Sequence, residues 1–348
     1  MNREVAIHTG PFTHLDHLVP ICLKFDLPLI VTDEKAYAIG KEFYPQISLT
    51  LMDPAALSLP FLARSFDTIF TCGKFWALEL RPLLQLFQSK QMRFVFCPHG
   101  NSDKEAFLQK SGKSVSQDTA LVYGPQMEAL MKNSAEKLIT VGNLREGFYK
   151  EHQDHFDKLF EEKFFLNPLK KTILYAPTWE TTATGTSFVS SASGVIDQLG
   201  DGYNLLVKPH PLLEESHPAH YYRMEGKCSS LPDVHFIDGF PAIYPILEKT
   251  DIYLGDHSSI GYDFLLYNRP IFFLSDKAGP LQSCGETINL EELKEKIASK
   301  QVELSGVRER VYRTCFEKTP LERAGSKLPP YSESSSSTTA TSCSSVSS

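Results

Sequence analysis

The chain has 348 residues, of which 42% are hydrophobic and 22% charged, which is typical of a globular protein with room for two domains and excludes a disordered or fibrous one. Its formal net charge of -7 excludes a global basic field that would attract nucleic acid, so local groups must bind any anionic ligand. The sequence has no apolar run of the roughly 18 to 20 residues that cross a bilayer.

The start of the chain and its cysteines bear on the compartment. The first ten residues, MNREVAIHTG, lead directly into a strand-like run with no signal-peptide pattern. The seven cysteines include no CxxC pair, which favours a reducing compartment and argues against a zinc knuckle. We therefore expect a cytoplasmic protein.

Short apolar runs typical of buried strands recur along the first half of the chain. They lie at 4–8, 28–32, 68–72, 93–97, 120–123 and 137–142. Helical spacing separates several of them, as at 78–90. Strands that are apolar throughout and alternate with helices indicate parallel sheets covered on both faces.

The second half of the chain repeats this plan. Its strand-like runs lie at 171–177, 203–209, 234–237, 251–255 and 270–274. Two such sets predict two α/β domains, which we place at 1–148 and 149–328, with a charged amphipathic helix at 149–165 as the bridge. A helix at 304–316 either is simply solvated or, as the family resemblance given below implies, crosses back to the first domain. The Ser/Thr-rich stretch 329–348 has almost nothing to bury, so we expect it to be disordered.

Three motifs suggest chemistry that the full pattern does not support. The segment HTGPFTHLDH resembles a dinuclear metal site, but Phe12 replaces one of its histidines, so we predict no metal and a substrate-lining loop with His14 and His17. The run SGKS at 111–114 lacks the glycine that opens a P-loop, since that position is Phe107. No GxGxxG follows a strand, so we predict no dinucleotide cofactor.

Polar turns follow four of the predicted strands. The turn in the first domain contains His99 and Gly100. The three turns in the second domain contain, in order, Thr178, Trp179 and Glu180; Lys208 and His210; and Asp256, His257, Ser258, Ser259 and Asp263. Ligands collect at the carboxyl ends of the strands in open parallel sheets, so the turns predict a cleft between the domains. The serines that begin the helix at 259–267 suit either an N-cap or an anion site.

The order of these motifs resembles one known family. HG, GxxR ending at Arg145, YAPTW, KPHP, DxSSxxxDF and NRPI occur in turn over Phe96 to Leu274. This pattern is similar to that of the CDP-glycerol glycerophosphotransferases, the teichoic acid primases and polymerases. The resemblance implies a GT-B-like α/β fold, with two Rossmann-like parallel-sheet domains facing an interdomain cleft. The acceptor would lie against the first domain and the nucleotide-linked donor against the second.

The resemblance also implies a reaction, the transfer of glycerol phosphate or a related polyol phosphate from a CDP-activated donor to a hydroxyl acceptor in cell-envelope polymer synthesis, with release of CMP. We expect no cofactor and no nucleic-acid partner. Through the resemblance alone we expect a lipid-linked acceptor and peripheral contact with the inner face of the cell membrane.

The implied site divides into three groups of residues. His99 would accept the proton of the attacking hydroxyl and His210 would act with it in catalysis. Donor and phosphate binding would fall to Arg145, Thr178, Lys208, Ser258, Ser259 and Asp263. The pyrophosphate would lie by Lys208, His210 and the two serines, with Asp263 orienting a serine or a donor hydroxyl. His14 and His17 would line the acceptor.

Departures from the family pattern leave alternatives open. GNLREG stands where GxPRND is usual, His257 where an aromatic residue is common, and Glu180 where a basic residue is common. A GT-B nucleotide-sugar glycosyltransferase or epimerase is one alternative function. A non-catalytic binding protein with the same fold is the other.

Overall fold

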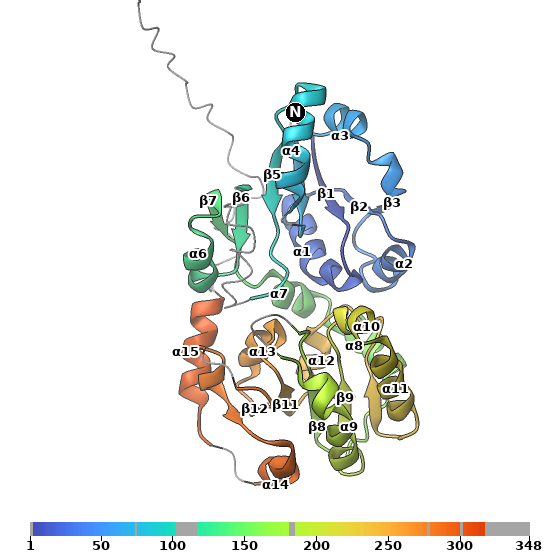
Figure 1. The fold of residues 1–348 in the computed structure, drawn as a ribbon, viewed down its shortest axis with the longest axis vertical. Helices are drawn as coiled ribbons and strands as arrows, with labels where there is room; N and C mark the ends of the chain where they lie inside the picture. The colour runs from blue at the N-terminus through green and yellow to red at the C-terminus, as the bar shows by residue number, and fades with distance from the viewer. Residues whose placement is uncertain are drawn as a thin grey trace, which may run out of the picture.

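The computed structural model describes residues 3–73, 75–101, 117–180, 185–276, 279–299 and 302–316. They form two α/β domains, the first drawn above the second in Figure 1, with helix α7 (Leu144–Glu151) between them. The predicted tail at 329–348 and the SGKS run at 111–114 lie outside the described residues.

The first domain is built on seven parallel strands in the order β3-β2-β1-β4-β5-β6-β7. The strands are β1 (Glu4–His8), β2 (Leu29–Val31), β3 (Leu49–Leu51), β4 (Thr68–Thr71), β5 (Arg93–Phe96), β6 (Gln117–Val122) and β7 (Ala135–Thr140). The helices beside them are α1 (Leu15–Phe25), α2 (Glu34–Phe43), α3 (Leu59–Ser65), α4 (Phe75–Gln88) and α6 (Pro125–Met131). The strand order reverses between β1 and β4, which makes their carboxyl ends the switch point where ligands bind in such sheets.

The second domain repeats the topology with six parallel strands in the order β10-β9-β8-β11-β12-β13. The strands are β8 (Thr172–Ala176), β9 (Asn204–Val207), β10 (Val234–Phe236), β11 (Ile252–Gly255), β12 (Ile271–Phe273) and β13 (Glu286–Thr287). The helices are α9 (Ser187–Leu199), α10 (Leu212–Ser216), α11 (Pro218–Ser229), α12 (Tyr244–Glu248), α13 (Ser259–Phe264) and α14 (Leu293–Ala298). Its switch point lies between β8 and β11.

Burial on both faces explains why the central strands are mostly apolar. All five residues of β8 are buried. Ile173 and Tyr175 pack into one apolar cluster, whereas Leu174 and Ala176 pack into the other. Successive side chains of a strand point to opposite faces, so a strand covered on both sides carries apolar side chains on both faces. The predicted GT-B-like architecture of two Rossmann-like domains is confirmed.

The connections between the domains differ in part from the prediction. The single helix expected at 149–165 is two helices, α7 and α8 (Gln153–Lys163), separated at His152, whose φ of -118° and ψ of 28° are not helical. Helix α15 (Ser305–Cys315) crosses back to the first domain, where it packs on α6 and brings the ring of Phe316 to 5.7 Å from that of Tyr123. The crossing alternative for this helix is thus confirmed (Figure 1).

Candidate functional site

Loops from the two domains meet where the strands end. Gly100 follows β5, and Ser259 begins α13 directly after the turn that follows β11. The two residues are so close that a Cβ on Gly100 would lie 2.7 Å from the Cβ of Ser259, and the φ of Gly100 is +128°. Both the contact and the left-handed backbone require glycine at this position. The contact brings the predicted first-domain turn against the predicted second-domain turn.

Three predicted histidines lie near this contact. The ring centroids of His14 and His99 are 4.4 Å apart with an interplanar angle of 31°. Burial lowers the pKa of His14 well below its ordinary value, and the charges of His99, His8 and His210 lower it further. His210 packs 6.0 Å from the ring of Trp179 on the second-domain side. The structure therefore gathers the two predicted catalytic histidines and His14 from both domains.

His17 supports the loop that carries His99. The Tyr123 hydroxyl donates to the carbonyl of Pro98 at 2.9 Å, and it lies 2.7 Å from Nδ1 of His17. Because the hydroxyl proton is used at Pro98, the Nδ1–H of His17 donates to the hydroxyl oxygen. Burial, followed by the charge of Arg145, lowers the pKa of His17 well below its ordinary value. These bonds connect His17 to the residue that precedes His99.

Arg145 lies between two carboxylates, one from each domain. Its guanidinium is 3.4 Å from Asp16 on α1 and 2.6 Å from Asp263 on α13. Tyr44 donates to Asp16 at 3.1 Å, and Tyr244 donates to Asp263 at 3.1 Å. Burial raises the pKa of Asp263, and the positive charge of Arg145 opposes this. The group forms a buried bridge between the domains.

This bridge corrects two of the predicted roles. Asp263 was expected to orient a serine or a donor hydroxyl, but its carboxylate binds Arg145 and Tyr244 instead, and its side chain is only 2% exposed. Arg145 was expected to reach a phosphate, but its side chain is 4% exposed and its charge is shared by two carboxylates. The positive charge of Arg145 is therefore balanced by the carboxylates of Asp16 and Asp263 at the domain junction.

Asp256 connects the two strands at the switch point of the second domain. Its Oδ2 accepts hydrogen bonds at 3.0 Å from the backbone N–H of Thr178, after β8, and at 3.0 Å from that of Ser187, which begins α9. Ser258 caps α13 by accepting from the N–H of Ile260 at 3.3 Å. Ser258 is therefore the N-cap of α13, a role in which its oxygen accepts and its hydroxyl proton can still donate. Ser258 and Ser259 are both half-buried.

Lys208 and His210 follow β9 on the same edge of the sheet. The amine of Lys208 is buried and donates to the carbonyl of Phe240 at 3.2 Å. Burial lowers its pKa to about 8, and the charge of Asp16 opposes the shift. Nδ1 of His210 accepts from the N–H of Leu212 at 3.2 Å, which leaves Nε2 as the nitrogen outside this bond.

Three residues of this region were missed by the sequence reasoning. Asp16 was considered only as part of a metal motif, and Cys72 only as one of the scattered cysteines. Asn101 is 2% exposed, and within the described part of the chain neither atom of its amide has a hydrogen-bond partner. Buried amides without partners are rare in proteins, so this one is suited to bind a polar group. The only sequence feature that could have marked Asn101 is its position directly after His99 and Gly100.

Comparison with known proteins identifies relatives of this chain. The family model of the CDP-glycerol:poly(glycerophosphate) glycerophosphotransferases matches residues 104–298, more than half of the chain. The chain belongs to this family.

Two curated members and two solved structures illustrate the relationship. The teichoic acid glycerol-phosphate primases of Bacillus spizizenii strain W23 and Bacillus subtilis strain 168 are 28% identical over 131 residues and 32% identical over 107 residues. These matches cover 37% and 30% of this glycerophosphotransferase family member, and 31% and 25% of the primases. The chain thus spans between a quarter and a third of the length of the curated relatives that it matches.

The solved structures share the fold. The wall teichoic acid polymerase TagF superimposes with a TM-score of 0.56 at 14% identity, over 89% of this chain and 82% of TagF. The UDP-GlcNAc 2-epimerase of Neisseria meningitidis gives a TM-score of 0.56 at 12% identity, over 91% of this chain and 94% of the epimerase. At these identities the similarity concerns the fold alone.

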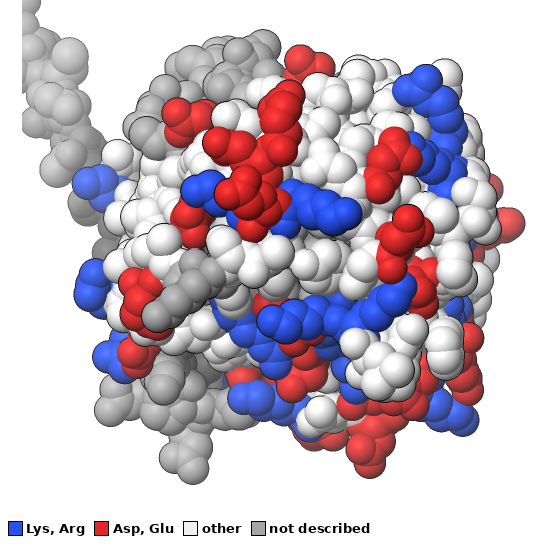
Figure 2. All heavy atoms as spheres, turned by 90° about the horizontal axis from the view of Figure 1, so that it is seen from below, with Lys and Arg blue, Asp and Glu red and all other residues white. Residues whose placement is uncertain are grey.

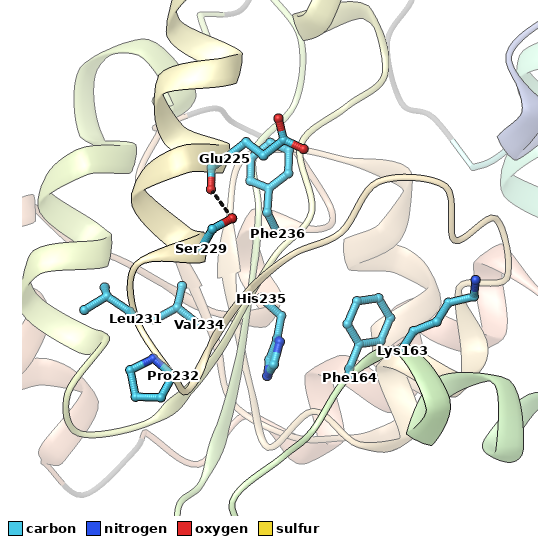
Figure 3. A pocket seen from close by; sticks show the side chains of 9 residues that line it. All are labelled: Lys163, Phe164, Glu225, Ser229, Leu231, Pro232, Val234, His235 and Phe236. Carbon is cyan, nitrogen blue, oxygen red and sulfur yellow. Dashed lines mark hydrogen bonds between the residues drawn. The ribbon is translucent and has the colours of Figure 1, made fainter.

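A separate pocket of about 430 Å³ lies on the second domain of this family member (Figure 3). Its lining comes from the end of α8, the end of α11 and the segment around β10: Lys163, Phe164, Glu225, Ser229, Leu231, Pro232, Val234, His235 and Phe236. Leu231 and Pro232 precede β10, which places this part of the pocket at the amino end of the strand, away from the predicted turns. None of the predicted site residues lines it.

The surface charges and the lengths of the helices are relevant to contact with a membrane. In the view of Figure 2, basic and acidic side chains are interleaved and separated by uncharged surface. Among the described residues, no helix is both long enough and apolar enough to span a membrane.

The Arg145 bridge predicts a large loss of stability when its cation is removed. Arg145→Met leaves Asp16 and Asp263 buried without a counter-charge, so we expect the free energy of unfolding to fall by about 3–5 kcal/mol. Lys158→Met, which removes an exposed cation 3.7 Å from Glu162 on α8, is the control and should change it by no more than about 0.5 kcal/mol. Denaturant unfolding measures both, and equal losses in the two variants would show that the Arg145 bridge does not stabilise the fold.

Proposed function

We propose that this protein transfers glycerol phosphate from CDP-glycerol to a hydroxyl acceptor in the synthesis of a cell-envelope polymer. The family match over residues 104–298 is the observation that carries the proposal. The close approach of Gly100, the residue after His99, to Ser259 of the second domain supports it, because a base and a diphosphate site must face each other for this reaction.

The reaction is a displacement at phosphorus. The acceptor oxygen bonds to the phosphorus that bears glycerol, the bond from that phosphorus to the bridging oxygen breaks, and CMP leaves with that oxygen. His99 takes the proton of the acceptor hydroxyl and later releases it to solvent. Catalysis of this kind depends mainly on positioning the reactants and neutralising charge on the phosphoryl oxygens.

The second domain supplies the groups that would bind the donor. Lys208 and His210 would lie against the diphosphate, and the hydroxyl groups of Ser258 and Ser259 would donate to its oxygens. Thr178 stands on the adjacent turn, held by the bond from its N–H to Asp256. In agreement, a TagF structure of the same fold was obtained after a soak with CDPG.

The first domain supplies the groups that would bind the acceptor. His14 lies against His99, and the amide of Asn101 is available to a hydroxyl or a phosphate oxygen. His17 would act indirectly, through Tyr123 and the backbone that leads to His99. A lipid-linked acceptor, a cytoplasmic location and contact with the inner face of the membrane remain predictions.

Donor identity separates this function from its alternatives. A ligand that binds the folded state alone raises the free energy of unfolding, by about 2.7 kcal/mol at about 100 times its Kd. In thermal-shift titrations we expect CDP-glycerol to raise Tm more than CDP-ribitol or UDP-GlcNAc at equal concentration. A larger shift with UDP-GlcNAc would instead support a nucleotide-sugar enzyme, and no shift with any nucleotide would support a non-catalytic protein.

Removal of the proposed base should affect chemistry and not donor binding. His99→Asn replaces the imidazole by an amide that cannot accept the proton, so we expect kcat to fall by about 10²- to 10⁴-fold with donor affinity largely unchanged. His220→Asn is the control, because His220 lies on α11 and contacts the carbonyl of Phe188. Release of CMP and calorimetric binding of CDP-glycerol provide the two readouts. Equal loss of turnover and binding in His99→Asn would contradict the assigned role.

The lowered pKa of Lys208 predicts how donor binding depends on pH. The amine is charged below its pKa of about 8 and neutral above it, so its attraction for a diphosphate is present below that pH and is lost as the pH rises through it. We expect the Kd for CDP-glycerol to rise by up to about tenfold per pH unit above this point. Lys208→Arg keeps the charge and should flatten this dependence. The same rise in both proteins would show that another group is responsible.

A further inference from the structure

Three side chains of metal-binding type meet at the carboxyl edge of the first sheet. An imidazole nitrogen of His14, the Sγ of Cys72 and an imidazole nitrogen of His99 all lie within 4.8 Å of one another. The three residues follow β1, β4 and β5, which are neighbours in the sheet. The topology therefore brings together residues that are far apart in the chain.

Two imidazoles and one thiolate form a ligand set suited to a soft divalent cation. Zn²⁺ binds histidine nitrogen at about 2.0 Å and cysteine sulfur at about 2.3 Å, so a tetrahedral ion needs these atoms about 3.5 Å apart. Small rotations of the half-buried imidazoles would close the remaining distance, whereas Cys72, which is 6% exposed, is fixed by packing. Three protein ligands leave the fourth position for water or another small ligand.

We propose that His14, Cys72 and His99 bind one soft divalent cation, with Zn²⁺ as the best fit. This ligand set differs from the motif that runs from His14 to His17. In that motif Asp16 binds Arg145, and His17 binds Tyr123. Cys72, which no sequence motif marks, takes the place of these residues as the third ligand.

Occupancy of this site would stop catalysis, an inference that rests on the proposed function. A neutral imidazole has one nitrogen with a free lone pair and one that carries a proton. Coordination of either nitrogen of His99 uses the lone pair and leaves the proton on the other, so the ring no longer accepts a proton from the acceptor. The cation would therefore act as an inhibitor that competes with the acceptor's proton for the lone pair of His99.

Metal binding by the full chain tests the site without any activity measurement. We expect one equivalent of Zn²⁺ to bind in competition with a chromophoric chelator, and one equivalent of Co²⁺ to give a near-ultraviolet thiolate-to-metal absorption band. Cys72→Ser should weaken Zn²⁺ binding at least about tenfold and abolish the band. Cys228→Ser, which changes a buried cysteine of α11 in the second domain, is the control and should leave both unchanged.

Two results would overturn the proposal: Co²⁺ that binds without a thiolate band, or Zn²⁺ affinity that is the same in the wild type and Cys72→Ser. Circular dichroism checks the fold of each variant. If Cys72→Ser fails to fold, His14→Gln, which removes a ligand outside the core, repeats the test.

An activity assay links the site to the proposed function. Zn²⁺ should inhibit Cys72→Ser at least about tenfold less strongly than the wild type, each relative to its own metal-free rate. Stoichiometric Zn²⁺ binding through Cys72 in a protein without transferase activity would reject the proposed function and retain the site.

Discussion

The buried ion pairs of Arg145 with Asp16 and Asp263 determine how the two domains meet. Charges removed from water have a large desolvation cost, which is offset only when the partners and their hydrogen bonds are well placed. Here Tyr44 and Tyr244 supply such bonds to the two carboxylates, one on each side of the guanidinium. A shift of either domain would separate a buried charge from its partner, so the bridge favours one arrangement of the domains.

This arrangement positions the candidate site. Asp263 lies on the same short helix as Ser259, and Ser259 contacts Gly100 in the first domain. The bridge therefore fixes the turn after β11 against the loop that carries His99. Arg145 and Asp263, which the sequence suggested as ligand-binding residues, instead pair with each other at the domain junction, beside the turns of the candidate site.

The sequence predicted the repeated fold well because strands buried on both faces, such as β1 and β8, carry runs of consecutive apolar residues. It missed β3 and β13, which lie at the sheet edges and have only three and two residues, too few to show a strand pattern. It also placed His99, Lys208 and His210 at strand ends, where local motifs mark them. The pairing of Asp16 with Arg145 spans 129 residues, and such a contact depends on tertiary structure that no local pattern records. The same reason explains why Cys72 was missed.

In the proposed function, a donor diphosphate lies between the turns of the second domain and His99 of the first. A crystal structure of the full chain with CDP-glycerol would show whether it does. We expect the diphosphate beside Lys208, His210 and Ser258, with the glycerol-bearing phosphorus facing the His99 ring. A nucleotide bound elsewhere, for example in the pocket beside His235, or a His99 ring directed away from that phosphorus, would contradict it.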